Sequence, residues 1–442
     1  MNAALFELER LRPLIQAAGK PLYRGRVANV SGMLVEATGV PAAVGELCRI
    51  QRGAQGPIEA EVVGFRGSQT LLMPHGDVQG IAPMQEVVAL GRPFSIAVGN
   101  ELLGRTLDGL GKPIDGGATL HPRDIRAVRV DSPDALSRPP IEETLQTGVR
   151  VIDGLNTIGR GQRIGIFAGS GVGKSTLLGQ ITRGTDADVT VVCLVGERGR
   201  EVGGFVREVL GDEGMRKAVL VVATSDRSPI ERYMAPFVAM TVAEHFRDQG
   251  LNVLLVMDSV TRFALAAREI GLAAGEPPTV RGFPPSFFAV IPKLVERMGR
   301  TPLGSITGLL TVLVDGDDPN EPVSDTLRGL LDGHIHLSRS IAQSGMFPAV
   351  DVLQSLSRLM PSLASREELA SAGFVRSCLA AWKEGKDLVE IGAYRPGTNP
   401  RLDTAMAHME AIQAFLRQDM HEHSPLVETR ELLALLSGAA KS

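Results

Sequence analysis

The sequence predicts an α/β protein with three parts: a small N-terminal β-barrel, a central domain with a mainly parallel sheet, and a C-terminal helical domain. Three observations support this prediction. Short apolar runs between glycines and prolines occupy residues 22–95, strand-like and helical patterns alternate over 150–345, and helical patterns continue beyond residue 360. With 442 residues, 44% of them hydrophobic and 22% charged, the chain can supply the cores of two or three domains.

The N-terminal part contains two segments of different texture. Residues 1–21 carry apolar side chains near helical spacing, interrupted by Pro13, which indicates either an arm that binds a partner or a helix packed on its own domain. Residues 22–95 contain β-like runs such as 26–30 and 70–73, separated by turn residues. Because short strands at this spacing favour a closed sheet, we expect a barrel that serves packing or assembly.

The central and C-terminal parts follow. Residues 96–360 form the predicted core, and its first segment, 96–150, is rich in Gly, Pro and Asp and indicates a linker that leads into the sheet. Strands are expected to begin near residues 163, 189, 218, 252, 306 and 334. Their alternation with helices implies a parallel sheet covered on both faces. Residues 361–442 are expected to form the helical domain.

A glycine-rich turn ending in Lys-Ser lies between an apolar run and a helical pattern. Strand, glycine turn and helix is the context that a phosphate-binding loop requires, because glycines let backbone N–H groups face phosphate oxygens at a helix N-terminus. Lys174 would reach the β- and γ-phosphates, and the Ser175 hydroxyl would ligate Mg²⁺. The loop residues are Ala168, Gly169, Ser170, Gly171, Val172, Gly173, Lys174, Ser175 and Thr176.

Two apolar runs downstream each end in an acid, as expected of buried parallel strands that reach a ligand site. Asp258 closes residues 252–258 and could hold Mg²⁺ through a water, although an apolar run ending in Asp is common by itself. Glu197 follows residues 189–195 and could orient or deprotonate a hydrolytic water. A glutamate at the start of a helix is the alternative interpretation of Glu197.

Composition excludes several classes of protein. A net charge of −4 and a pI near 6.1 give no general attraction to nucleic acid, and an aromatic content of 4% leaves few side chains on which single-stranded bases could stack. The three cysteines lie far apart and indicate reduced, packed thiols. The chain carries no apolar run of membrane-spanning length, and its N-terminus lacks a signal-peptide core. We therefore expect a cytoplasmic protein that reaches a membrane through partners.

Taken together, the motifs resemble the ATPase family of the flagellar type III protein export apparatus, which is itself similar to the catalytic subunit of rotary ATP synthases. The resemblance extends from about residue 22 to 420. Its markers, in order along the chain, are residues 102–115, 147–155, 196–201, 258–264, 275–285 and 332–335.

The resemblance implies a homohexameric ring of subunits, each with a barrel, a RecA-like P-loop core and a helical domain. It also implies that ATP hydrolysis with Mg²⁺ is coupled to protein export. Glu197 matches the catalytic carboxylate, Lys174 the loop lysine, and Ser175 and Asp258 the magnesium ligands. Arg198 matches a residue beside the catalytic carboxylate, and Glu201 likewise flanks that acid; both are expected to support it by hydrogen bonding.

Two further residues gain a role only through the resemblance. Phe347 matches the aromatic that stacks on adenine, and Arg358 matches the arginine finger that reaches the γ-phosphate in the neighbouring subunit. From the residues alone, a packed phenylalanine and a surface arginine paired with an acid are favoured. Tyr394 could close the other side of the adenine pocket.

The resemblance also implies partners: regulatory and stalk proteins, export substrates with their chaperones, and a membrane export gate, but no nucleic acid. It implies peripheral association with the inner-membrane apparatus. The injectisome ATPase is the nearest alternative. A non-hydrolysing ring subunit would carry glutamine in place of Glu197, and a rotary catalytic subunit would carry an acidic loop that is missing after residue 390. An RNA translocase would need more aromatics than Tyr23, Phe65 and Phe94 in its barrel.

Overall fold

The computed structural model describes residues 23–120, 124–314 and 321–438. The predicted N-terminal arm, residues 1–21, lies outside the described residues. The described chain divides into two compact units, one that ends at Ser95 and includes Ile270–Glu276, and one that contains the other residues from Ile96 onward. Among the described helices, none is long and apolar enough to cross a membrane.

The first unit contains a closed barrel of six strands, as predicted, paired antiparallel in the order β1-β2-β5-β4-β3-β6. Inward-facing side chains such as Val27, Val35 and Leu72 form its core. Gly32 and Gly67 open two-residue hairpin turns with positive φ, which glycine adopts without strain. The elements are β1 (Arg24–Ser31), β2 (Leu34–Thr38), β3 (Glu46–Ile50), η1 (Gly53–Gln55), β4 (Ile58–Arg66), β5 (Gln69–Pro74) and β6 (Glu86–Pro93).

The second unit is built on a sheet in the order β19-β18-β12-β17-β15-β13-β14-β8, with β16 paired to β17. Neighbours from β18 to β8 are parallel, whereas β19 and β16 pair antiparallel. Every residue of β13 and β14 is buried, which explains their continuous apolar sequences. The strands are β8 (Thr106–Asp108), β12 (Arg163–Ala168), β13 (Val189–Val195), β14 (Ala218–Ala223), β15 (Asn252–Asp258), β16 (Gly299–Arg300), β17 (Ser305–Leu313), β18 (Gly333–Leu337) and β19 (Leu356–Ser357). The predicted strand starts are confirmed.

The segment 96–150 does more than link two parts of the chain, because β8 adds an outer strand to the sheet. Its Gly- and Asp-rich sequence builds the turn after β8, and Asp115 beyond this turn pairs with Arg105 before the strand, with Asp115 Oδ1 2.7 Å from Arg105 Nη2. The Asp108 carboxylate accepts from two backbone N–H groups of the same turn. The other elements are β7 (Ser95–Val98), η2 (Asn100–Leu102), β9 (Asp124–Ala127), η3 (Ala135–Ser137), β10 (Thr144–Leu145) and β11 (Ile158–Gly159), with β7 paired to β9 and β10 to β11.

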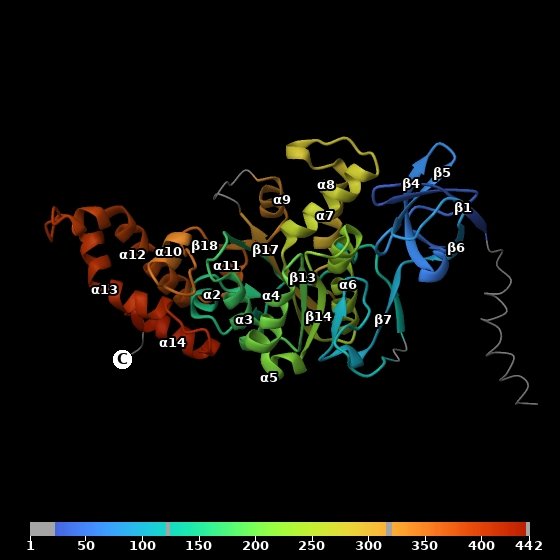
Figure 1. Ribbon diagram of the computed structural model, residues 1–442. Coiled ribbons are helices and arrows are strands. Elements are labelled where there is room, and N and C mark those ends of the chain that lie inside the picture. The colour runs from blue at the N-terminus through green and yellow to red at the C-terminus, as the bar shows by residue number, and fades with distance from the viewer. Residues whose placement is uncertain (1–22, 121–123, 315–320, 439–442) are drawn as a thin grey trace, which may run out of the picture. The chain divides into compact units, whose positions relative to one another are not determined.

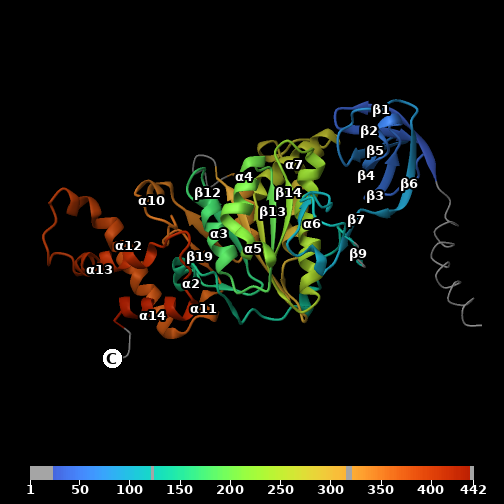
Figure 2. The same cartoon turned by 60° about the horizontal axis from the view of Figure 1, so that its bottom comes forward.

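Helices alternate with the strands (Figure 1) and cover the sheet, with α6 packed on β13, β14 and β15 (Figure 2). The Ser228 side chain caps the start of α6, and Pro229 occupies its first turn, where no intrahelical N–H bond is lost. The elements are α2 (Arg150–Leu155), α3 (Lys174–Gly184), α4 (Gly199–Gly204), η4 (Phe205–Leu210, a π-helix), α5 (Gly211–Arg216), α6 (Pro229–Arg247), α7 (Val260–Ala273), η5 (Val280–Gly282), α8 (Pro285–Val295), α9 (Pro322–Leu330), α10 (Arg339–Gln343) and α11 (Met360–Leu363).

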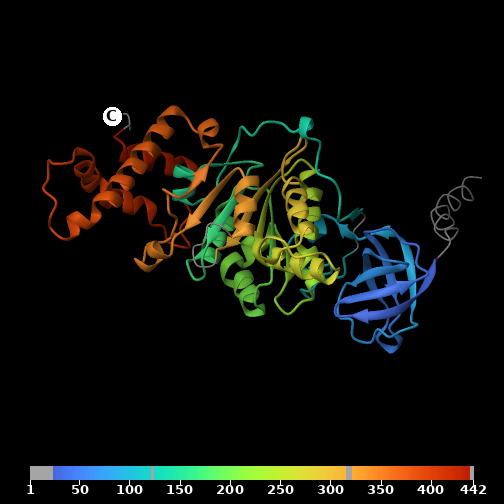
Figure 3. The same ribbon diagram turned by 90° about the horizontal axis from the view of Figure 1, so that it is seen from above.

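The C-terminal part is helical, as predicted, and consists of α12 (Arg366–Glu390), α13 (Pro400–Leu416) and α14 (Leu426–Leu436). The three helices pack on one another and on α2, and appear in orange and red in Figure 3. Ser365 and Glu368 form a capping box that fixes the start of α12. Val375, Ile412 and Leu433 are buried in the core that these helices share with the sheet.

Candidate active site

A glycine-rich turn joins β12 to α3, in the strand–turn–helix order that the sequence predicts. Ala168 is the buried last residue of β12, and Lys174 is the first residue of α3. Gly171 and Gly173 have φ of +77° and +87°, a conformation that side-chain-bearing residues rarely adopt. The turn thus leads directly into the N-terminus of a helix of 11 residues, an arrangement suited to an anion.

The remaining loop residues differ in exposure. Gly169 and Val172 are buried and anchor the turn, whereas Ser170 is exposed at its tip. Ser175 and Thr176 lie exposed in the first turn of α3. Their hydroxyls are therefore accessible at the same helix end as the lysine.

Lys174 lies between two acids, because the four consecutive parallel strands β12, β17, β15 and β13 bring their carboxyl ends to one edge of the sheet. Its ammonium forms an ion pair with Asp258, the last residue of β15, and lies 3.9 Å from Glu197 Oε1, just beyond β13. The Thr311 hydroxyl of β17 donates to Asp258 Oδ1 at 2.6 Å. Asp258 is only 3% exposed, so its charge depends on these partners. The sequence-predicted residues Lys174, Glu197 and Asp258 are brought together.

The Glu197 carboxyl is held by groups from two other segments. Arg262 of α7 lies with Nη1 3.3 Å from Glu197 Oε2, and its guanidinium also donates to the Gly196 carbonyl. Glu201 in α4 forms a carboxyl–carboxyl hydrogen bond with Glu197. Arg198 is largely exposed, and its Nη1 lies 3.6 Å from Glu201 Oε1.

The pKa of Glu197 lies near neutral pH. Burial, first of all, raises the pKa of Glu197 to about 7, and the hydrogen bond with Glu201 acts in the same direction. The nearby Lys174 and Arg262 oppose this rise by favouring the anion. The same hydrogen bond lowers the pKa of Glu201, which therefore stays anionic. A carboxyl with a pKa near ambient pH can accept a proton from water, which is the task of a general base.

Phe347 lies beside the glycine turn. Its ring atoms are 3.3 Å from where a β-carbon on Gly173 would stand, and its side chain is half-exposed, at 43%. The backbone N–H of Gln418 donates to the Phe347 carbonyl at 2.9 Å. An aromatic face thus borders the loop, where a base attached to bound phosphates could stack.

Arg358 is not part of this cluster. It follows β19, the outermost strand at its end of the sheet, and its exposed guanidinium donates to the Arg328 carbonyl at 3.4 Å. Its backbone N–H donates to the Asp332 carbonyl. Within the described residues, Arg358 makes no hydrogen bond or ion pair with Lys174 or the two acids.

Tyr394 also lies elsewhere. It sits in the loop between α12 and α13, where its hydroxyl is 2.9 Å from Asp403 Oδ1 and 3.1 Å from the Asn399 carbonyl. These contacts hold that loop against the start of α13. The residue that the structure brings to Phe347 is instead Gln418, at the end of α13.

Sequence reasoning missed two partners of the acids, Arg262 and Thr311. Arg262 lies within the marker 258–264, in the first turn of α7 and four residues after Asp258, and this short distance along the chain would place it at the same sheet edge. Thr311 is one of two threonines in the apolar strand β17, and nothing in the sequence of that strand indicates a role for it.

Family models match three consecutive parts of the chain. The β-barrel domain of the ATP synthase alpha/beta family matches residues 27–91, the nucleotide-binding domain of that family matches 148–357, and the T3SS EscN ATPase C-terminal domain matches 364–434. A flagellum-specific ATP synthase from Bacillus subtilis is 47% identical over 418 residues, which cover 94% of this chain and 95% of that protein. The chain belongs to the ATP synthase alpha/beta family, among its type III export members.

Two other relatives support this membership. A type 3 secretion system ATPase from Xanthomonas euvesicatoria is 48% identical over 417 residues, covering 94% of each chain. The solved structure of the assembled ATPase EscN in complex with its central stalk EscO, from enteropathogenic E. coli, is 43% identical. It matches with a TM-score of 0.87 over 93% of this chain and 100% of that one. This confirms the three-part fold that the sequence predicts.

Proposed function

We propose that the chain hydrolyses ATP to ADP and phosphate and couples this reaction to protein export by a flagellar type III apparatus. The observation that carries the chemistry is the position of Lys174 between Asp258 and Glu197, beside the glycine turn. A cation flanked by two acids at the start of a helix suits phosphoryl transfer to water, in which positioning and charge stabilisation do most of the work.

The residues present fit ATP with Mg²⁺. The loop 168–176 would receive the phosphates, with Lys174 on the β- and γ-phosphates, and Phe347 would stack on adenine. Ser175 offers an exposed hydroxyl and Asp258 a buried carboxylate, both hard oxygen donors of the kind Mg²⁺ prefers. When bound, the ion would neutralise phosphate charge during the reaction.

Glu197 would orient the attacking water and accept its proton, since its pKa lies near ambient pH. Arg262 holds one oxygen of that carboxyl in place, whereas the hydrogen bond to anionic Glu201 belongs to the protonated form of Glu197. Arg198 would act from further out, by pairing with Glu201. Glu197 is thus restrained by Arg262 as the anion and by Glu201 when it is protonated.

Arg358 would complete the site of a neighbouring subunit in a homohexameric ring. Its exposure at the sheet edge and the assembled state of the EscN relative support this proposal. A guanidinium suits the charge that accumulates on the phosphoryl oxygens in the transition state.

The proposed organisation follows the sequence: a partner-binding arm at 1–21, a barrel at 22–95, the ATPase core at 96–360 with its linker at 96–150, and a helical domain at 361–442. A stalk protein is the best-supported partner, because the EscN relative was solved with its stalk. Regulators, export substrates with chaperones, and the membrane gate are further proposed partners. The protein would act in the cytoplasm at the inner-membrane apparatus.

An injectisome is the second candidate setting, favoured by a relative of type 3 secretion that is as similar as the flagellar one, at 48% against 47% identity. The two settings differ in what the chain restores. Expression in strains that lack either the flagellar or the injectisome ATPase, with motility and effector secretion as readouts, would separate them.

The proposed shared site is tested by the ATPase rate per subunit as protein concentration rises. Wild type should show a steep, association-dependent increase that Arg358→Ala abolishes. Arg401→Ala is a matched control, because Arg401 is exposed at the start of α13. Full activity of isolated subunits, unchanged in Arg358→Ala, would overturn the shared site.

A further inference from the structure

We propose that Gln418 is a positioning residue for the adenine side of the pocket: it fixes the segment that holds Phe347 beside the phosphate loop. The inference rests on the proposed ATPase function. Gln418 follows α13 and is 3% exposed, so its carboxamide must find partners inside the protein.

The backbone of Gln418 connects it to Phe347. Its N–H donates to the Phe347 carbonyl at 2.9 Å, while the Phe347 ring lies against the turn at Gly173. The position of the ring over the loop therefore depends on where the 415–422 segment is held. A shift of that segment would move the ring away from a stacked base without moving Lys174.

The side chain of Gln418 supplies the anchor. Oε1 accepts from the Arg150 N–H at 2.9 Å, and Nε2 donates to the Gly148 carbonyl at 2.7 Å and to the Glu422 carbonyl at 3.0 Å. Donor and acceptor are both used, and the contacts join the end of α13 to the start of α2. Truncation would leave the Arg150 N–H and the Gly148 carbonyl without this partner in a buried place.

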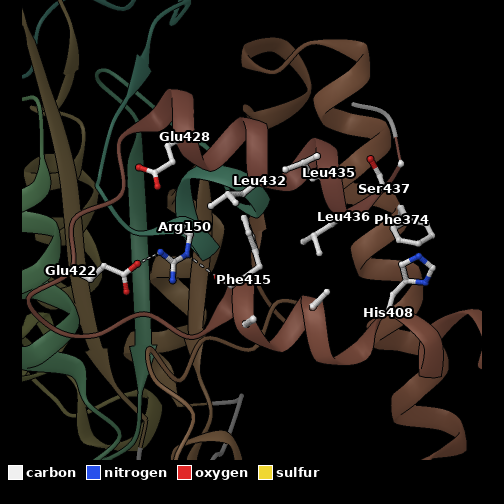
Figure 4. A pocket seen from close by; sticks show the side chains of 13 residues that line it. Arg150, Phe374, His408, Phe415, Glu422, Glu428, Leu432, Leu435, Leu436 and Ser437 are labelled. Carbon is white, nitrogen blue, oxygen red and sulfur yellow. Dashed lines mark hydrogen bonds and ion pairs between the residues drawn. The ribbon is translucent and has the colours of Figure 1, made fainter. Parts of the chain in front are cut away.

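The two segments that Gln418 contacts, at Arg150 and at Gly148, are each held by further contacts. The Arg150 guanidinium donates to the Phe415 carbonyl and pairs with Glu422, and Figure 4 shows it between these two residues. On the other side, the buried Asp153 carboxylate accepts from the Gly148 N–H at 2.9 Å and so fixes the turn that receives Gln418. The marker 147–155 thus has a place in the pocket's support, although it lies outside the phosphate loop.

The test distinguishes an effect on the binding of the adenine base from an effect on the binding of the phosphates. In Gln418→Ala we expect the KM for ATP to rise about tenfold with kcat within about twofold of wild type, because ground-state contacts to the base are weakened. Inhibition by inorganic tripolyphosphate with Mg²⁺, which has no base, should stay unchanged. Gln413→Ala is the matched control, since Gln413 is exposed near the end of α13, just before Gln418.

Gln418→Glu is the second variant, which keeps the acceptor and the size but loses the two donated bonds, in case the alanine variant does not fold. An unchanged KM in a folded variant, or an equal loss of tripolyphosphate binding, would overturn the positioning role. Absence of ATP hydrolysis in wild type would instead refute the proposed function itself.

Discussion

The ATPase rate should rise with pH across neutrality, because Glu197 must be deprotonated to accept a proton from water. Burial raises the pKa of Glu197 to about 7, so the protonated, inactive form dominates below that pH. The deprotonated fraction is then about one tenth at pH 6 and about nine tenths at pH 8. We therefore expect kcat/KM to increase about tenfold between these values, with its midpoint near pH 7.

Glu201→Gln should move this midpoint to lower pH. Anionic Glu201 favours protonated Glu197 by accepting its hydrogen bond, and an amide removes that charge. Burial remains the largest cause of the raised pKa, so the midpoint should fall without reaching that of an ordinary glutamate. Glu208→Gln is the control, because Glu208 is exposed in η4.

The assay is phosphate release at several ATP concentrations for each pH, with excess Mg²⁺. Each series yields kcat/KM, which reports groups of the free enzyme. A flat profile between pH 6 and 8, or a midpoint that rises in Glu201→Gln, would refute the assignment of Glu197 as the base.

The remaining predictions concern single side chains. Lys174→Ala should weaken ATP binding about 10- to 100-fold in equilibrium titrations, since a charged hydrogen-bond donor is lost; wild-type affinity would contradict its phosphate role. Glu197→Gln should still bind ATP but lose turnover about 10²- to 10⁴-fold, and near-normal turnover in assembled protein would exclude it as the base. Arg297→Ala should lower the free energy of unfolding by about 3–5 kcal/mol in urea titrations, because Glu244 would remain buried without its ion-pair partner. A loss below about 1 kcal/mol would show that the pair contributes little.

The sequence predicts the cluster of acids because its signal is local. Apolar runs end at Asp258 and just before Glu197, and the carboxyl ends of parallel strands share one edge, so both acids could be placed beside the glycine turn. The three-part fold follows from similar local periodicities. The roles of Phe347 and Arg358 came only from family resemblance and stay predictions.

Other features depend on tertiary contacts that no local pattern contains. The hydrogen bond between Gln418 and Phe347 joins a residue that precedes α12 in the sequence to one that follows α13. Thr311 of β17, which contacts Asp258, has no feature in the sequence that distinguishes it from other strand residues. The contact of the Tyr394 hydroxyl with Asp403 is likewise absent from any local pattern, and the role of Tyr394 beside adenine stays a prediction. The outer strand β8 was hidden by its turn-rich sequence.

Helix α3 has consequences beyond the residue that begins it. At its far end, the Arg183 guanidinium donates to the carbonyls of Val209 in η4 and Met420 before α14. An α-helix of 11 residues is a rod about 16 Å long that resists compression. If α3 tilts at its lysine end, Arg183 at the other end would therefore move with it. That movement would displace the segments of Val209 and Met420, to which Arg183 is hydrogen-bonded.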